Sequence, residues 1–282
     1  MRRVLVALDQ SPVSLAALEE AAALAAGLQA ELEGVYVLDA ELLRLSALPL
    51  AWETGIVSGA RRALDHEQME RSLRTQAEKA RQALESVARR HRLRCSFVLS
   101  QGNVAVELTA AAARADVLAM GLIGHAGLAG GRVGSTTRRI RASARCALLL
   151  LGPGQRHGQT VVAVANGTPD ADSGLDLALE IARRRDAPLV VAIAADVSER
   201  GAVREKLQTR LADAGVPVRI EEIPMDGFDA LRGLVVRQGG GLLVVGRDSR
   251  VLAGHDEDLD RLGCPVMLAH APGSTGVPDA PV

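Results

Sequence analysis

The residues from Met120 to Ser135 have the composition of a phosphate-binding loop. Six glycines lie in this stretch, at positions 121, 124, 127, 130, 131 and 134, directly after an apolar run at 117–120. A helix-compatible sequence follows. Glycines let backbone N–H groups converge on one ligand, and a helix start adds unpaired N–H donors and a positive dipole end. The pattern favours an anion site over an idle surface loop, because such long loops are uncommon unless they are functional.

The elements around this loop alternate between apolar strands and amphipathic helices. Asp9 directly follows the first strand, so it belongs to the same edge of the sheet as Gly121. Alternating apolar strands and helices are typical of parallel βαβ units, and the sequence therefore predicts an α/β fold. In the first half we expect strands at 4–8, 31–38, 94–99, 116–120 and 146–151, and helices at 14–28, 41–48, 61–92, 105–114 and 135–144.

The second half of the chain repeats the first. Residues 4–12 align with residues 161–169 at an offset of 157, and the cysteines at 146 and 264 occupy matching places. The glycine loop is lost from the second copy: the offset is 125 between Gly121 and Gly246 but 118 at the cysteines, so seven residues are missing. The repeat predicts two domains, 1–153 and 160–271, followed by a loose tail at 272–282.

Two further differences concern charge. Asn166 stands where the first copy has Asp9, and the acidic residues 256–258 stand where a phosphate would lie. The sequence therefore predicts one phosphate site in the first half and none in the second. An acidic turn at 255–258 could also hold a cation, but a solvated turn is the favoured interpretation.

Composition excludes several function classes. The net charge is −1 and aromatic residues make up 1% of the chain, so neither a basic nucleic-acid surface nor aromatic base stacking is expected. No apolar run has the length of a membrane span or a secretion signal. The three cysteines are widely spaced beside apolar runs, which indicates buried thiols in a reducing cytoplasm, with a redox role as the lesser alternative.

Two glycine spacings and their strand–helix context carry a family resemblance. The motif Gly121-x2-Gly124-x9-Gly134-Ser135, with Asp9 after the first strand, resembles the ATP-binding signature of the universal stress protein family. A tandem member would contain two doubly wound, five-stranded parallel sheets in strand order 3-2-1-4-5. This architecture is Rossmann-like and of the adenine nucleotide alpha-hydrolase-like type. The resemblance covers residues 1–153 and, more weakly, 160–270.

The resemblance also implies a ligand and the residues that hold it. Ala7, Asp9 and Val37 would contact the adenosine of ATP, while the glycine loop and the following helix start would hold the ribose and phosphates. Mg²⁺ would bridge phosphate oxygens with few protein ligands, and no catalytic residue is assigned. The implied binding residues are Ala7, Asp9, Val37, Met120, Gly121, Gly124, His125, Gly134, Ser135 and Thr136.

Three functions remain open at this stage. The favoured one is a nucleotide-dependent stress-response or signalling module with an unknown protein partner. The alternatives are a slow ATP hydrolase, for which no base is evident near Ser135, and an interaction module that has lost nucleotide binding. We further expect the two halves to pair through their last strands as a pseudo-dimer, and two chains to associate. Arg132, Arg138 and Arg139 could bind phosphate, but an exposed face or an interdomain contact is at least as plausible for them.

Overall fold

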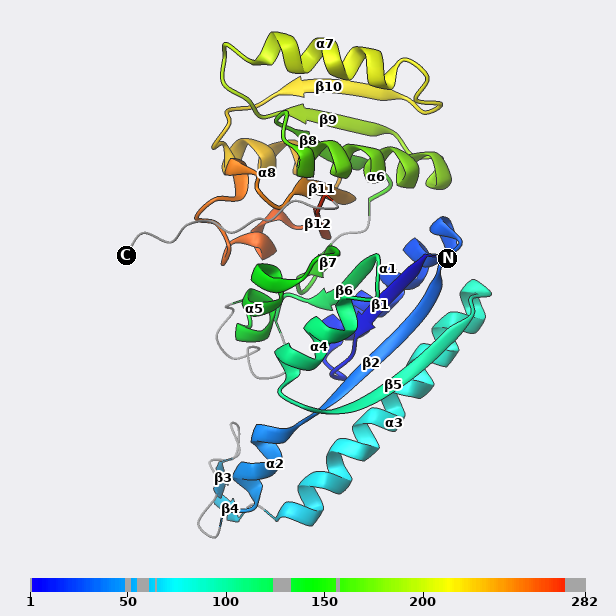
Figure 1. The fold of residues 1–282 in the computed structure, drawn as a ribbon, viewed down its shortest axis with the longest axis vertical. Helices are drawn as coiled ribbons and strands as arrows, with labels where there is room; N and C mark the ends of the chain where they lie inside the picture. The colour runs from blue at the N-terminus through cyan, green and yellow to red at the C-terminus, as the bar shows by residue number, and fades with distance from the viewer. Residues whose placement is uncertain are drawn as a thin grey trace.

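The computed structural model of the chain describes residues 2–48, 52–54, 61–63, 65–123, 133–155 and 158–271. Strands and helices alternate along it as the sequence predicts (Figure 1). The strands are β1 (Arg3–Ala7), β2 (Glu31–Asp39), β3 (Trp52–Thr54), β4 (Arg61–Ala63), β5 (Cys95–Gly102), β6 (Val117–Gly121), β7 (Ala147–Leu151), β8 (Val161–Ala165), β9 (Leu189–Ile193), β10 (Val218–Glu222), β11 (Leu242–Gly246) and β12 (Val266–Ala269). The α-helices are α1 (Pro12–Leu28), α2 (Ala40–Ser46), α3 (His66–His91), α4 (Val104–Ala112), α5 (Ser135–Ser143), α6 (Pro169–Arg185), α7 (Arg200–Leu211) and α8 (Phe228–Arg237), with short 3-10 helices at Arg250–Leu252 and Leu259–Leu262.

Ten strands form one sheet, in the order β10-β9-β8-β11-β12-β7-β6-β1-β2-β5. Numbered within each half, both sets of five follow the order 3-2-1-4-5, which confirms the predicted topology. All neighbours within a half are parallel, whereas β7 and β12 pair antiparallel, with Val266 opposite Leu150 and Leu268 opposite Leu148. The last strands therefore join the two halves within the chain, as expected for a pseudo-dimer.

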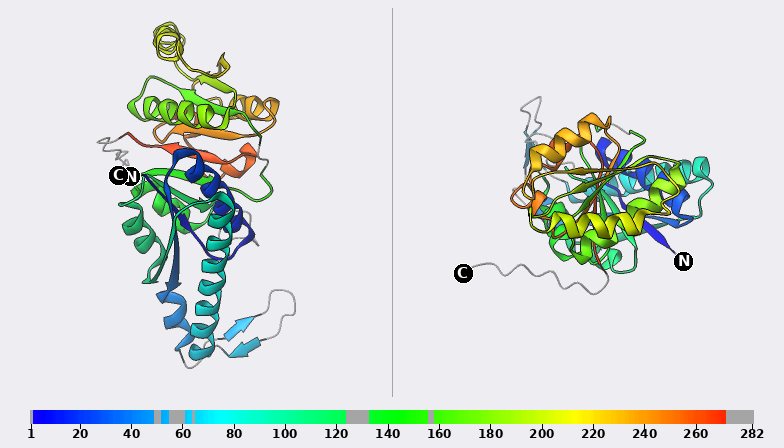
Figure 2. Two further views of the ribbon diagram at one scale, coloured as in Figure 1. Left: turned by 90° about the vertical axis from the view of Figure 1, so that its right-hand side faces the viewer. Right: turned by 90° about the horizontal axis from the view of Figure 1, so that it is seen from above.

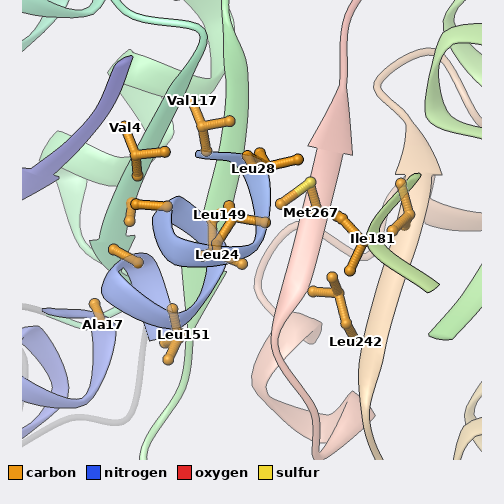
Figure 3. Packing of buried hydrophobic residues seen from close by; sticks show 14 of the residues in the cluster. Val4, Ala17, Leu24, Leu28, Val117, Leu149, Leu151, Ile181, Leu242 and Met267 are labelled. Carbon is orange, nitrogen blue, oxygen red and sulfur yellow. The ribbon is translucent and has the colours of Figure 1, made fainter. Parts of the chain in front are cut away.

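The core lies on both faces of this sheet and crosses the junction. Figure 2 shows helices on either side of the strands. One apolar cluster combines Leu24 and Leu149 of the first half with Ile181 and Met267 of the second (Figure 3). A second cluster on the opposite face includes residues from β7 and β12 as well. The halves are therefore held together by shared apolar packing in addition to the strand pair.

The largest departure from the sequence prediction lies before α3. We predicted a helix over 61–92, but α3 begins at His66, and 61–63 form the strand β4, antiparallel to β3. The Asp65 carboxylate accepts a hydrogen bond from the Glu67 N–H at 3.0 Å and so fixes the helix start. The equivalent α7 has 12 residues against 26 in α3, in line with the shorter second copy.

The cysteine prediction was partly wrong. Cys146 and Cys264 are buried, but Cys95 is exposed because it begins a strand at the end of the sheet. No helix among the described residues is both long and apolar enough to cross a membrane. The domain boundaries stay a prediction, and the tail at 272–282 lies outside the described residues.

Candidate functional site

Asp9 lies in the turn between β1 and α1. Its Oδ1 accepts the Ser11 N–H at 2.9 Å, and its own N–H donates to the Ser14 hydroxyl at 3.4 Å. Ser11 caps the helix by accepting the Ser14 N–H at 3.1 Å. Because these bonds fix both the turn and the helix start, the Asp9 carboxylate has a defined position at the carboxyl end of β1.

Gln10, the next residue, was missed by the sequence prediction. Its backbone is left-handed, with φ of 64°, although it is not a glycine. Its Nε2 is buried and has no hydrogen-bond partner within the part of the chain that the structure describes. A left-handed non-glycine backbone and an unpaired buried amide are both costly, and strained residues cluster at functional sites. The repeat held a signal, since the equivalent residue is Gly167, with φ of 81°.

Gly121 ends β6, the strand directly beside β1. A Cβ at Gly121 would lie 3.0 Å from Cγ1 of Val13 and 3.3 Å from the Ile123 carbonyl oxygen. The first turn of α1 therefore approaches the end of β6 closely, and glycine permits that approach. This contact brings the two predicted sides of the site together at the point where the strand order reverses, which is the usual ligand position in such sheets.

The N-terminus of α5 is fastened to the same strand end. Gly134 is the N-cap and donates its N–H to the Leu122 carbonyl at 2.9 Å, while the Thr137 hydroxyl donates to the Gly121 carbonyl at 3.2 Å. No side chain caps this helix start, and its first turn contains no acidic residue. Ser135 is exposed and Thr136 half-buried, and helix starts of this kind can donate their first N–H groups to an anion.

The predicted adenosine contacts share one face of the sheet. Ala7 and Val37 are half-buried and pack against the same apolar cluster as Met120, whose side chain is buried. Tyr36 lies on the opposite face and donates to Gln76 Oε1 at 3.2 Å. Burial, with a smaller contribution from Asp9, raises the pKa of Tyr36 to about 12, so its hydroxyl stays protonated at neutral pH.

The body and far end of α5 are bound by the second half. Arg138 pairs with Glu257 at 3.2 Å, and Arg141 pairs with Asp256. The guanidinium of Arg247 donates to the carbonyl of Ala144, the C-cap of α5, and at 2.9 Å to that of Cys146. Burial lowers the pKa of Arg247. The helix that starts at the candidate phosphate site is thus a contact between the two halves.

These contacts bear on two charged segments whose roles the sequence left open. Arg138 makes an interdomain contact, whereas Arg132 lies outside the described residues. The acidic turn carries ion pairs, and no group of three or more potential metal ligands exists among the described residues. Gly124 and His125 also lie outside the described residues, so their assignment stays a prediction.

The equivalent place in the second half is closed by its own side chains. The Asn166 Oδ1 accepts the Thr168 N–H at 3.1 Å, and the Thr168 hydroxyl lies 3.0 Å from an Asp248 carboxylate oxygen. Burial raises the pKa of Asp248, and the nearby Asp170 carboxylate adds to the effect. A Cβ at Gly246 would lie 2.7 Å from the Ala171 nitrogen. This crevice contains carboxylates and tightly packed backbone, which do not suit a phosphate.

Comparison with known proteins agrees with this architecture. A universal stress protein from Archaeoglobus fulgidus DSM 4304 superposes with a TM-score of 0.71 at 13% identity, over 96% of this chain and 97% of that one. A putative universal stress protein from Pseudomonas aeruginosa UCBPP-PA14 gives 0.57 at 17%, over 96% and 93%. The cytoplasmic domain of a prokaryotic cation chloride cotransporter gives 0.50 at 12%, over 96% and 95%.

At these identities the structural likeness concerns the fold alone. No curated protein matches the chain. A profile of the Universal stress protein family matches residues 1–152, which is more than half of the 282 residues and includes the strand ends and helix start described above. The chain belongs to the Universal stress protein family.

Proposed function

We propose that the first half binds ATP and that the chain is a nucleotide-dependent signalling module with a single site. The observation that carries this proposal is the open helix start of α5 at the end of β6, next to the fixed Asp9 turn on β1. Both lie where the strand order reverses. The other half offers only a closed, acidic counterpart.

The charges around the proposed site suggest how ATP would be oriented in it. The N-terminus of α5 is the positive end of a helix dipole and would hold the phosphates through the N–H groups and hydroxyls of Ser135 and Thr136. Asp9 is an acceptor that repels phosphate, so it would face hydroxyl or amino donors of adenosine, near Ala7 and Val37. Mg²⁺ would neutralise phosphate charge with few protein ligands of its own.

Signalling would pass through α5. Nucleotide bound at its first turn would favour one arrangement of α5, and the same helix contacts the acidic turn and Arg247 of the second half. A ligand that prefers one arrangement of α5 shifts the population of the contacts at its far end. The second half would then respond to nucleotide bound in the first half and would not bind nucleotide itself. We place the chain in the cytoplasm on its sparse, unpaired cysteines.

The nucleotide content of the purified full chain tests the proposal. We expect adenine nucleotide to be released on denaturation and identified by mass spectrometry. We also expect added Mg·ATP to raise the melting temperature by several degrees, because a ligand at about 100 times its Kd contributes about 2.7 kcal/mol. No bound nucleotide together with no thermal shift would establish the interaction module without ligand and overturn the proposal.

Matched variants place the site in one half. Gly134→Val and Asp9→Ala should each remove the thermal shift, while Asn166→Ala in the second half should leave it unchanged. Loss of the shift in Asn166→Ala alone would move the site to the other copy. A turnover assay separates the remaining alternative: ATP consumption that disappears in Asp9→Ala would favour the slow hydrolase over the binding module.

A further inference from the structure

The two edge strands of the ten-stranded sheet, β10 and β5, differ in length and in charge. At one end, β10 is five residues long, and three of them are charged: Arg219, Glu221 and Glu222. Glu221 forms an ion pair with Arg237, and Glu222 forms one with Arg204. Charged, short strands of this kind protect a sheet edge from pairing with another chain. In Figure 1, β10 lies next to α7 at one end of the sheet, and β5 lies at the opposite end.

The other end lacks such protection. β5 is eight residues long, and its sequence, Cys-Ser-Phe-Val-Leu-Ser-Gln-Gly, contains no charged residue and no proline. Val98 is 38% exposed and Leu99 44% exposed, although they point to opposite faces. Among the described residues, β2 is the only strand that pairs with β5. A long, neutral edge with exposed apolar side chains is a template for another strand.

The backbone of this edge has a defined pattern of free groups. The Leu32 N–H donates to the Arg94 carbonyl, and Leu32 is in register with Cys95. Since alternate residues of a strand turn their N–H and C=O groups to the same side, the groups of Cys95, Phe97, Leu99 and Gln101 point away from β2. Their midpoint is Val98.

We propose that β5 pairs antiparallel with β5 of a second copy of this chain, so that the sheet continues through a two-fold axis at Val98. In this register Phe97 lies opposite Leu99 of the second copy, and Cys95 lies opposite Gln101 of the second copy. All the outward N–H and C=O groups of these four residues are then paired. The two Val98 side chains face each other across the axis as a non-hydrogen-bonded pair.

Two features select a second copy over another kind of partner. A two-fold contact brings the residue at the axis next to its own equivalent, so a charge at that position would repel itself, whereas the uncharged Val98 does not. The chain also already joins two α/β units by antiparallel pairing of edge strands, β7 with β12. The β5 contact would extend the same sheet by the same kind of junction, over a longer strand.

The oligomeric state of the full chain tests this surface. Analytical ultracentrifugation should show a dimer at micromolar concentration. Val98→Lys should raise the dimer Kd at least about 30-fold, because it places two like charges at the axis and removes apolar contact. The matched control is Val106→Lys on α4, which changes a 62% exposed valine outside the edge and should alter Kd less than about twofold.

Cross-linking tests the register even if the lysine variant folds poorly. In a Cys95→Ser background, Val98→Cys should form an intermolecular disulfide on oxidation, since directly opposed non-hydrogen-bonded residues have Cα atoms about 4.5 Å apart. Val106→Cys in the same background should not. A chain that stays monomeric at about 100 µM overturns the proposal. So does a dimer that persists in Val98→Lys and gives no cross-link through Val98→Cys, which would locate the dimer on another surface.

Discussion

Two equivalent places in the fold differ in what surrounds them. One lies at the carboxyl ends of β1 and β6, and the other at the carboxyl ends of β8 and β11. In the first half, the strand ends lie beside the start of α5, and the nearest neighbour of a Cβ at Gly121 would be the Val13 side chain at 3.0 Å. In the second half, backbone of α6 fills the equivalent space beside Gly246, and Asp248 lies against Thr168. If the proposed site is correct, the chain keeps one such place for ligand and fills the other with its own residues.

The second copy also makes contacts with α5 of the first half. Its shortened segment after β11 contains Arg247, Asp256 and Glu257, and all three reach the helix or strand end of the first half. The copy without the glycine loop thus has a segment that docks on α5. At the proposed site the second half would contribute indirectly, by holding the helix at which ligand would bind.

The largest expected effect comes from adding one methyl group at the two strand ends. Gly246→Ala should lower the free energy of unfolding by about 3 kcal/mol, because its Cβ would lie 2.7 Å from the Ala171 backbone nitrogen, which cannot move alone. Gly121→Ala should cost about 1 kcal/mol, because its nearest neighbour is the rotatable Val13 side chain. Urea unfolding without nucleotide measures both. Equal losses would contradict the distinction between a closed and an open copy.

Removal of Arg247 should have the next largest effect. Arg247→Met keeps most of the side-chain volume but leaves the Ala144 and Cys146 carbonyls without this donor, and we expect a loss of about 2 kcal/mol in urea unfolding. Arg138→Ala is the matched control. Its ion pair with Glu257 is exposed, so its loss should stay within about 0.5 kcal/mol. A reversed order would mean that the surface ion pairs hold α5.

Much of this architecture follows from local sequence. The alternation of strands and helices and the division into two copies could be predicted from apolar runs and the internal repeat, whereas the strand order came from the family resemblance. The start of α3 could not be placed, since residues 61–64 continue a helical pattern and only the Asp65 cap ends it. Cys95 was misjudged because an apolar run does not reveal whether its strand lies inside the sheet or at its edge.

The candidate site was predictable to a similar degree. The glycines, Asp9 and the helix start depend on residue type and spacing, which the sequence displays. The partners of Arg138 and Arg141 depend on how the second half is placed, and no spacing specifies that. The residue type of Gln10 gave no indication of a role in the site. Its left-handed backbone becomes visible only in three dimensions, or through comparison with Gly167 of the repeat.

Exchange of these two residues gives the third prediction. Gln10→Gly should raise the free energy of unfolding by about 0.5 kcal/mol, since glycine adopts positive φ without strain, although its flexible unfolded chain offsets part of the gain. The same change should weaken the proposed nucleotide binding severalfold, because it removes a buried amide donor. Gly167→Gln should cost about 1 kcal/mol without changing binding. If Gln10→Gly leaves nucleotide affinity unchanged, Gln10 does not face the ligand.

The smallest expected effect concerns the carboxylate that closes the second copy. Because burial raises the pKa of Asp248 in the folded state, the fold favours the protonated form, so its contribution to stability is present at low pH and is lost as pH rises through the folded-state pKa. Asp248→Asn resembles the protonated form and keeps an oxygen for Thr168. The variant should melt on the order of 1–2 °C above the wild type at pH 7, and the difference should vanish near pH 3. If Asp248→Asn is instead less stable than the wild type at pH 7, the negative charge of Asp248 stabilises the second half, and the size of its side chain is not sufficient.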